Sequence, residues 1–243
     1  MSAHRVPSGP PPEPVVQKLR LRYAKRGRMR FTSVRDFQRA LERAVRKAEL
    51  PIGFSAGFHP HPKISYANAA PSGAASEAEY AEIGLTARCD PEDVRARLDA
   101  ALPAGLDIVE VVEATPGALA DRLDTSVWRI TVAGVPSAEV TAAVAALLAA
   151  ETVPTVRLMK TGPRTLDVRD AVLRASHDGP DQDGCEILTV VVRHTTPAVR
   201  PDDVLNALRT VAGLEPPTPP QATRLAQGLW DGAGTVANPL ASP

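Results

Sequence analysis

The order in which strand-like and helix-like segments follow one another strongly limits what this chain can fold into. In the first half, a segment with alternating apolar residues is followed by an amphipathic helical segment, two strand-like segments, a second helical segment and a last strand. The second half repeats this order over a similar length. Short strands in the order β-α-β-β-α-β are typical of a ferredoxin-like unit. The sequence therefore predicts an α+β protein of two tandem ferredoxin-like (β-α-β-β-α-β) units.

The first strand and helix have the clearest local pattern. Leu19, Leu21 and Tyr23 alternate with cations, and after a turn at Gly27 the alternation resumes through Phe31, which predicts a hairpin or a kinked strand with these apolar side chains in the core. Ser33 then begins a helix with a capping-box-like start, and Pro51 ends it.

The expected domain boundaries follow from changes in amino-acid composition along the chain. Residues 1–14 are rich in Pro and Ser and are expected to be a disordered leader, followed by a basic domain over 15–115, an acidic domain over 116–229 and a flexible tail over 230–243. No apolar run approaches the roughly 20 residues that span a bilayer, and the N-terminus lacks the apolar stretch of a secretory signal. With only two cysteines, these features predict a reduced, cytoplasmic protein without a membrane association.

The charge of the chain is balanced overall but uneven along its length. The whole chain has 28 basic and 28 acidic residues, yet residues 18–47 contain twelve basic residues and two acidic ones. Such a local excess of positive charge attracts polyanions. We therefore expect the cations of the first strand pair and one stripe of the first helix to share one outward-facing surface.

A Gly/Pro-rich loop over residues 53–63 is expected to add to this surface. Its glycines and prolines favour an irregular, stiff backbone that can serve either a ligand or a purely structural crossover. Cations neutralise phosphates, and aromatic rings stack on bases, so this combination favours RNA. The predicted RNA-binding residues are Arg20, Arg22, Arg28, Arg30, Arg35, Arg39, Arg43, Phe58, His59, His61 and Lys63.

No cofactor or metal is predicted from the residues. His59 and His61 are two residues apart, but the other histidines are distant in sequence and show no ligand-like spacing, whereas a metal site needs three or four ligands. Two cysteines cannot hold an iron–sulfur cluster. We also predict no catalytic residue, although His59 or His61 could act in acid–base chemistry beside the cations.

Three segments resemble the radical SAM-associated (radical SAM-linked) protein family, whose biochemical role is undefined. They are RMRFTSVRDFQRALERAVRKAELP, FSAGFHPHPKISYANAAPSG and SEAEYAEIGL, and TRLAQG over Thr223–Gly228 is also similar. Members are fused behind a cobalamin-binding radical SAM module or occur as separate proteins, so the resemblance implies such a protein as a partner. The family usually has a histidine after the serine that begins the first helix, where this chain has Val34.

The function expected from the residues and the resemblance together is that of a non-catalytic RNA-binding accessory protein. It would present tRNA or rRNA to a cobalamin-dependent radical SAM enzyme. One alternative is a metal-independent RNA-processing or RNA-modifying enzyme that uses the loop histidines. Another is a protein–protein docking module for the radical SAM partner, without nucleic acid.

Overall fold

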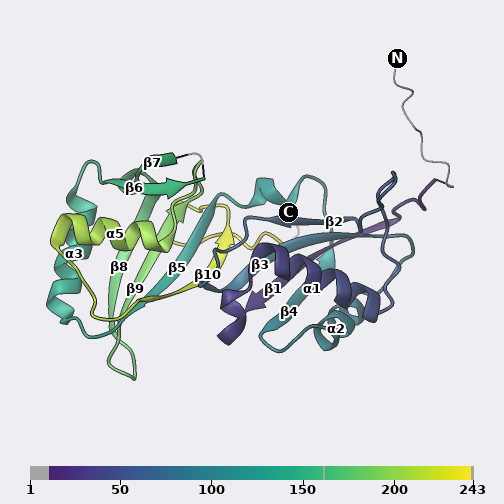
Figure 1. The fold of residues 1–243 in the computed structure, drawn as a ribbon, viewed down its shortest axis with the longest axis horizontal. Coiled ribbons are helices and arrows are strands. Elements are labelled where there is room, and N and C mark those ends of the chain that lie inside the picture. Colours follow the sequence, from purple (N-terminus) through teal and green to yellow (C-terminus); the bar gives the residue numbers. More distant parts are fainter. Residues whose placement is uncertain (1–10, 161, 242–243) are drawn as a thin grey trace, which may run out of the picture. The chain divides into compact units, whose positions relative to one another are not determined.

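The computed structural model describes residues 11–160 and 162–241 (Figure 1). Residues 1–10 of the predicted leader lie outside this part, and residues 11–14 are exposed and have no regular secondary structure. The described chain divides into unit 1, with residues 11–72 and 79–119, and unit 2, with residues 73–78, 120–160 and 162–241. The division falls close to the predicted boundary after residue 115, except that residues 73–78 group with the C-terminal unit.

Unit 1 packs two helices against a sheet. Its strands have the order β4-β1-β3, with β2 paired to β3, and β1 runs antiparallel to β4. The core between sheet and helices contains Leu21 of β1, Leu41 of α1, Ile83 of β3 and Leu98 of α2. The elements are β1 (Gln17–Lys25), η1 (Gly27–Phe31), α1 (Val34–Lys47), β2 (Ile64–Ala67), β3 (Ala75–Leu85), α2 (Pro91–Ala101) and β4 (Leu106–Glu113).

The segment after the Gly27 turn is not a strand. Residues Gly27–Phe31 form the 3₁₀ helix η1, so the predicted hairpin or kinked strand is wrong there. Leu19, Leu21 and Tyr23 are buried as predicted, but Phe31 is 60% exposed. Five residues make fewer than two turns of a 3₁₀ helix, which has three residues per turn, so alternation over so short a segment does not distinguish it from a strand.

Unit 2 contains a four-stranded sheet of order β10-β5-β9-β8 and a separate two-stranded ribbon, β6-β7. The first residues of β3 pair in parallel with β10 through Ala75 and Ser76. The elements are η2 (Leu119–Arg122), which begins at the end of unit 1, β5 (Thr125–Val132), α3 (Ser137–Ala149), β6 (Pro154–Met159), β7 (Gly162–Asp167), α4 (Val168–Ala171), β8 (Val172–Pro180), β9 (Glu186–Arg193), α5 (Pro201–Ala212) and β10 (Gln221–Gly228).

The fold class is therefore mixed α+β with a mostly antiparallel sheet and five α-helices in the described part. The prediction of two tandem ferredoxin-like units is not confirmed. Strands β6 and β7 form a ribbon separate from the four-stranded sheet of unit 2, which the repeated β-α-β-β-α-β order did not predict. Among the described residues, no helix is long and apolar enough to cross a membrane.

The segment predicted as a flexible tail makes specific contacts within unit 2. Trp230 forms a β-bridge with Val236, and the Trp230 N–H donates to Asp124 Oδ1 at 2.9 Å. Arg122 donates to the carbonyl oxygens of Pro239 and Ala241, and Leu240 is buried. Residues 230–241 therefore pack on the second unit.

Candidate nucleic-acid interface

Helix α1 carries the candidate interface, and its own sequence explains how it is held. Ser33 is the N-cap residue, and its hydroxyl accepts a hydrogen bond from the Asp36 N–H at 3.2 Å. At the other end, Arg97 of α2 donates to the carbonyl oxygens of Ala48 and Glu49. The buried side of the helix comprises Phe37, Ala40, Leu41, Ala44 and Val45. The opposite side is therefore fixed toward solvent.

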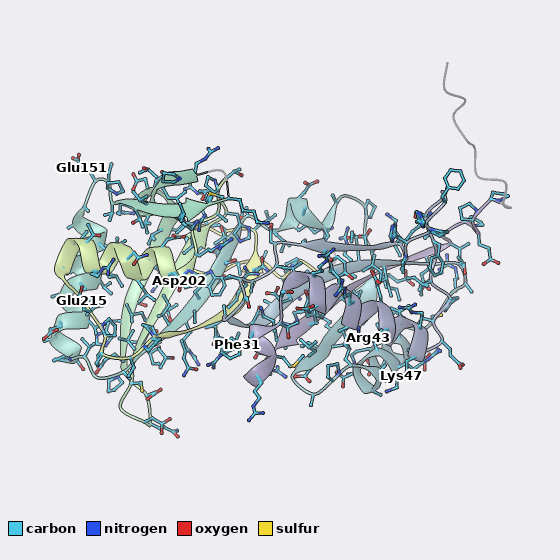
Figure 2. The ribbon with its side chains drawn as sticks, viewed as in Figure 1. Phe31, Arg43, Lys47, Glu151, Asp202 and Glu215 are labelled. Atoms are coloured by element: carbon cyan, nitrogen blue, oxygen red, sulfur yellow. The ribbon has the colours of Figure 1, made fainter. Side chains whose placement is uncertain are left out.

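The solvent side of α1 bears a row of cations that we call the α1 row: Arg35, Arg39, Arg43 and Lys47. All four side chains are exposed, and within residues 11–160 and 162–241 none of them has a carboxylate within ion-pair distance. Figure 2 shows Arg43 and Lys47 along this helix. Neighbouring Arg46 instead turns back along the helix, donating from Nε to the Glu42 carbonyl oxygen at 3.2 Å. The sequence places Arg35, Arg39, Arg43 and Arg46 on one stripe of this helix; the first three belong to the exposed row, and Lys47 takes the place expected for Arg46.

Arg20 of β1 does not belong to any exposed surface. Its side chain is 1% exposed, and its Nε lies 3.1 Å from Glu82 Oε2 on β3. It also donates to Thr115 Oγ1 at 3.1 Å and to the Gly117 carbonyl oxygen at 2.5 Å. The expectation that Arg20 belongs to an outward-facing cationic surface is therefore wrong, because Nε, Nη1 and Nη2 of its guanidinium group all bond to the protein itself.

Two other cations of β1, Lys18 and Arg22, are also matched by nearby carboxylates. Lys18 Nζ lies 3.3 Å from Glu82 Oε1, and Arg22 Nη2 lies 3.3 Å from Glu110 Oε2 on β4. Arg22 and Glu110 are register partners across the antiparallel pair of β1 and β4. Opposite charges placed across strands attract each other. The face of β1 that was expected to present its cations to solvent is thus largely neutralised by carboxylates within unit 1.

The 3₁₀ helix η1, before α1, contains two of the predicted RNA-binding cations. It also contains Phe31, an aromatic residue that was predicted in the core and not at the interface. Arg28 is exposed, and the Arg30 guanidinium lies 4.7 Å from the centroid of the Phe31 ring. The backbone of Phe31 is fixed, since its carbonyl oxygen accepts a hydrogen bond from Ser72 Oγ at 2.9 Å. The alternation with arginines predicted Phe31 in the core, whereas the ring is 60% exposed.

The 53–63 loop is held at its base and open at its tip. Phe54 and Pro62 form a β-bridge, and the Ser55 N–H donates to the His61 carbonyl oxygen at 2.8 Å. A Cβ on Gly53 would lie 2.8 Å from Val15 Cγ2, so glycine is needed there for close packing. The predicted contacts Phe58, His59, His61 and Lys63 are all exposed, with Phe58 at 60%.

The loop histidines form no recognisable catalytic or metal constellation. Within the part of the chain that the structure describes, the side chains of His59 and His61 make no hydrogen bond, and no group of three or more His, Cys, Asp or Glu residues is placed to hold a metal ion. Acid–base catalysis needs a histidine oriented toward the proton that it transfers. The exposure of these two histidines is therefore the only property in which they resemble the other predicted RNA contacts of the loop.

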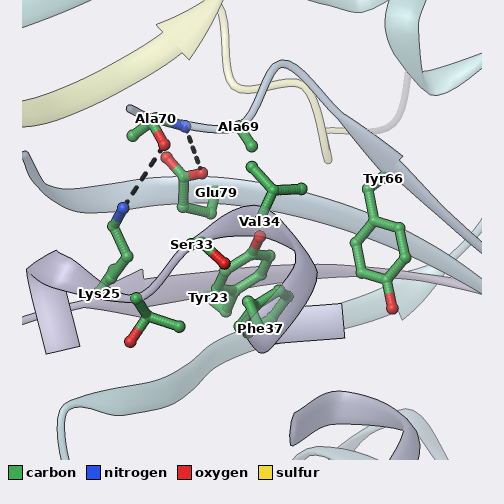
Figure 3. A pocket seen from close by; sticks show the side chains of 10 residues that line it. Tyr23, Lys25, Ser33, Val34, Phe37, Tyr66, Ala69, Ala70 and Glu79 are labelled. Atoms are coloured by element: carbon green, nitrogen blue, oxygen red, sulfur yellow. Dashed lines mark hydrogen bonds between the residues drawn. The ribbon is translucent and has the colours of Figure 1, made fainter. Parts of the chain in front are cut away.

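A small cavity of about 10 Å³ lies between β1 and the start of α1, and Val34 is one of the residues that line it (Figure 3). The ring of Tyr23 stacks on Phe37 at 4.0 Å between centroids, and Tyr66 meets Phe37 edge-on at 6.0 Å. Burial, and secondarily the charge of Glu42, raises the pKa of Tyr66. A volume of this size holds roughly one water molecule. Val34, which lines this cavity, is 45% exposed.

Two buried charged residues, Lys25 and Glu79, border the same cavity and fix the loop that follows β2. Lys25 Nζ donates to the carbonyl oxygens of Ala70 and Pro71 at 3.5 and 3.2 Å, and the Ala70 N–H donates to Glu79 Oε2 at 2.9 Å (Figure 3). Buried charges are tolerated when they are hydrogen-bonded. We interpret this cluster as structural support for the start of α1.

The structure thus separates the predicted contacts into three groups. Arg20 and Arg22 are paired with glutamates of unit 1. Arg28 and Arg30 of η1 are followed by Arg35, Arg39 and Arg43 of α1, and the predicted loop residues lie in the segment between α1 and β2. An exposed cationic helix face can neutralise successive phosphates of a nucleic acid, and it needs no cofactor for that.

The comparison with known proteins gives a family without an assigned activity. No curated protein matches the chain. A family model described as "Uncharacterized protein conserved in bacteria (DUF2344)" matches residues 18–201, which include η1, α1, the 53–63 loop and most of unit 2. The match covers more than half of the 243 residues. The chain therefore belongs to this conserved bacterial family, DUF2344.

Proposed function

We propose that the chain is a non-catalytic RNA-binding accessory protein, and that the α1 row provides the main contact. The observation that carries the proposal is the row itself: four exposed cations on one helix, with no carboxylate within ion-pair distance in the described residues. Exposed charges are normally interspersed with charges of the opposite sign. A row left unmatched retains its field for an external polyanion.

The neighbouring cations support the same interpretation. Arg28 and Arg30 lie in η1, immediately before the helix, and extend the positive charge beyond its N-terminal end. Arg20 and Arg22 are left out of the proposed contact because Glu82 and Glu110 already neutralise them. The proposed interface is therefore smaller than the one expected from sequence, and it is centred on a helix.

We also infer that both units derive from one ferredoxin-like plan. Unit 1 has the element order β1-α1-β2-β3-α2-β4 and the strand order β4-β1-β3-β2. If the β6-β7 ribbon and α4 are treated as an insertion, unit 2 has the order β5-α3-β8-β9-α5-β10 and the corresponding strand order β10-β5-β9-β8. The two orders agree strand by strand, which supports a tandem repeat with an insertion in the second copy.

The partner in this proposal comes from the resemblance, and neither the partner nor the RNA class comes from the geometry. The accessory protein would present tRNA or rRNA, in the cytoplasm, to a cobalamin-dependent radical SAM protein. Co-purification from cells with and without nuclease treatment tests this arrangement, because an RNA bridge is lost on nuclease treatment whereas direct protein docking is retained. Nuclease-resistant association without any bound RNA would favour the docking-module alternative.

Charge reversal on α1 tests RNA binding itself. The variant Arg35→Glu/Arg39→Glu/Arg43→Glu should lose measurable binding to total bacterial RNA. Its matched control, Arg129→Glu/Arg164→Glu/Arg193→Glu, changes three exposed arginines of unit 2 and should bind like the wild type. The corresponding triple alanine variant should reduce the slope of log affinity against log salt by about 2, at roughly 0.7 per phosphate contact to a single strand. Equal loss in the helix variant and the control would contradict an interface on α1.

A further inference from the structure

An exposed aromatic ring stands at the N-terminal end of the α1 row. Phe31 is 60% exposed, and it is the last residue of η1, three residues before the first residue of α1. Figure 2 shows Phe31 beyond this end of the helix, with Arg43 and Lys47 farther along it. A single exposed hydrophobic residue is common on protein surfaces and carries no meaning alone. What distinguishes Phe31 is the set of groups around it.

The Phe31 ring is presented by a fixed backbone and lies beside a guanidinium plane. The Thr32 N–H donates to the Met29 carbonyl oxygen at 2.9 Å, and Ser72 Oγ donates to the Phe31 carbonyl oxygen, also at 2.9 Å. The Arg30 guanidinium carbon lies 4.7 Å from the ring centroid. Aromatic rings and arginine guanidinium planes are the two side-chain surfaces on which unpaired bases stack. Phe31 and Arg30 offer both at one place.

The spacing of the α1 row fits a single polynucleotide strand. Arg35, Arg39 and Arg43 are four residues apart, which places successive cations about 6 Å apart along the helix axis, with a rotation of about 40° per step. Neighbouring phosphates along one strand are separated by a comparable distance. A strand whose phosphates follow the row would bring a nucleotide to the Phe31 end of the helix.

We propose that Phe31 is a base-stacking site and that the ligand is therefore a single-stranded segment of RNA, such as an unpaired loop or end. The inference rests on the proposed RNA binding and specifies its substrate class. Stacking on a side chain requires a base that is free of its own helix, and the major groove of an A-form duplex is too deep and narrow for side chains to reach the bases. A duplex could use the α1 row through its phosphates, but it would leave Phe31 without a base.

The test compares one oligoribonucleotide in two forms. The probe is a 12-nucleotide RNA with a central 2-aminopurine, used alone and annealed to its complement. Phe31→Ala should weaken binding of the single strand about 5- to 150-fold, corresponding to the loss of one stacked base. It should leave duplex binding and the salt slope unchanged. Phe31→Trp should retain single-strand affinity, and the added tryptophan emission should be quenched on binding.

The controls separate failure of this inference from failure of the proposed function. Leu158→Ala removes a side chain that is 82% exposed on β6 and should bind both probes like the wild type. Thermal unfolding of Phe31→Ala should match the wild type, since the ring is not in the core. Wild-type affinity of Phe31→Ala for the single strand, or equal weakening for both probes, would overturn base stacking while leaving RNA binding by α1 intact. Absence of binding by the wild-type protein to either probe would overturn both.

Discussion

The guanidinium group of Arg20 and the carboxylate of Glu82 form an ion pair inside unit 1, with Nε 3.1 Å from Oε2 and the arginine side chain 1% exposed. Two further hydrogen bonds, to Thr115 Oγ1 and to the Gly117 carbonyl oxygen, satisfy the rest of the guanidinium group. This pair ties β1 to β3 and to the segment after β4. A residue that looks like a surface cation in the sequence is thus part of the interior.

Replacing Arg20 should therefore affect stability and not RNA affinity. Removal of one partner of a buried ion pair typically costs about 3–5 kcal/mol. Glu82 would keep its contact with the exposed Lys18 at 3.3 Å, so we expect Arg20→Met to lower the free energy of unfolding in urea by at most about that amount. The control Arg35→Met, on the exposed side of α1, should stay within about 0.5 kcal/mol of the wild type. Unchanged stability together with lost RNA affinity in Arg20→Met would show that Arg20 faces the ligand.

The comparison of Arg20 with Arg35 shows what the sequence could and could not predict about the interface. The exposed face of α1 was predictable, because helix periodicity is a local property and a stripe of Phe37, Leu41 and Val45 determines the opposite side. The pairing of Arg22 with Glu110 depends on the register between β1 and β4, about 90 residues apart in sequence. Local patterns carry no information about register between distant strands.

The fold shows the same difference between local features, which the sequence pattern predicts, and long-range strand pairing, which it does not. The extents of β1 and α1 follow from alternation and from the cap at Ser33. The separation of β6-β7 from the main sheet does not, because a strand that reads as apolar and alternating can join any available edge. Phe31 was misassigned for a related reason: alternation over only a few residues after Gly27 cannot distinguish a strand from a 3₁₀ turn.

Acidification should weaken the link between α3 and β9 in unit 2. Hydrogen bonds from Ser137 Oγ and from His177 Nε2, at 2.6 and 2.5 Å, lower the pKa of Glu186. A carboxylate with a lowered pKa in the folded state stabilises the protein above the pKa that it has when unfolded, and this contribution is lost as pH falls through the folded-state pKa. Glu186→Gln should therefore reduce the urea midpoint at pH 7, and its difference from the wild type should begin to shrink below the ordinary glutamate pKa of about 4.3 and disappear below the lowered folded-state pKa.

The control for this prediction is Glu151→Gln, which changes an exposed glutamate between α3 and β6. Its urea midpoint should follow that of the wild type across the same pH range. A constant difference between Glu186→Gln and the wild type at all pH values would mean that the charge of Glu186 does not contribute to the bonds with Ser137 and His177.

Packing of residues 230–241 on unit 2 should depend on Gly228. A Cβ at this position would overlap the carbonyl oxygen of Ala237, whose N–H donates to the Leu229 carbonyl oxygen at 2.9 Å. Both neighbours are backbone atoms, so β10 or the following segment must move. Gly228→Ala should lower the free energy of unfolding by about 1–3 kcal/mol, as overpacking does, and should accelerate proteolysis within 230–241. In a chain that ends at Leu229 the same substitution should cost little, because Ala237 is gone; an equal cost in both chains would place the steric conflict elsewhere.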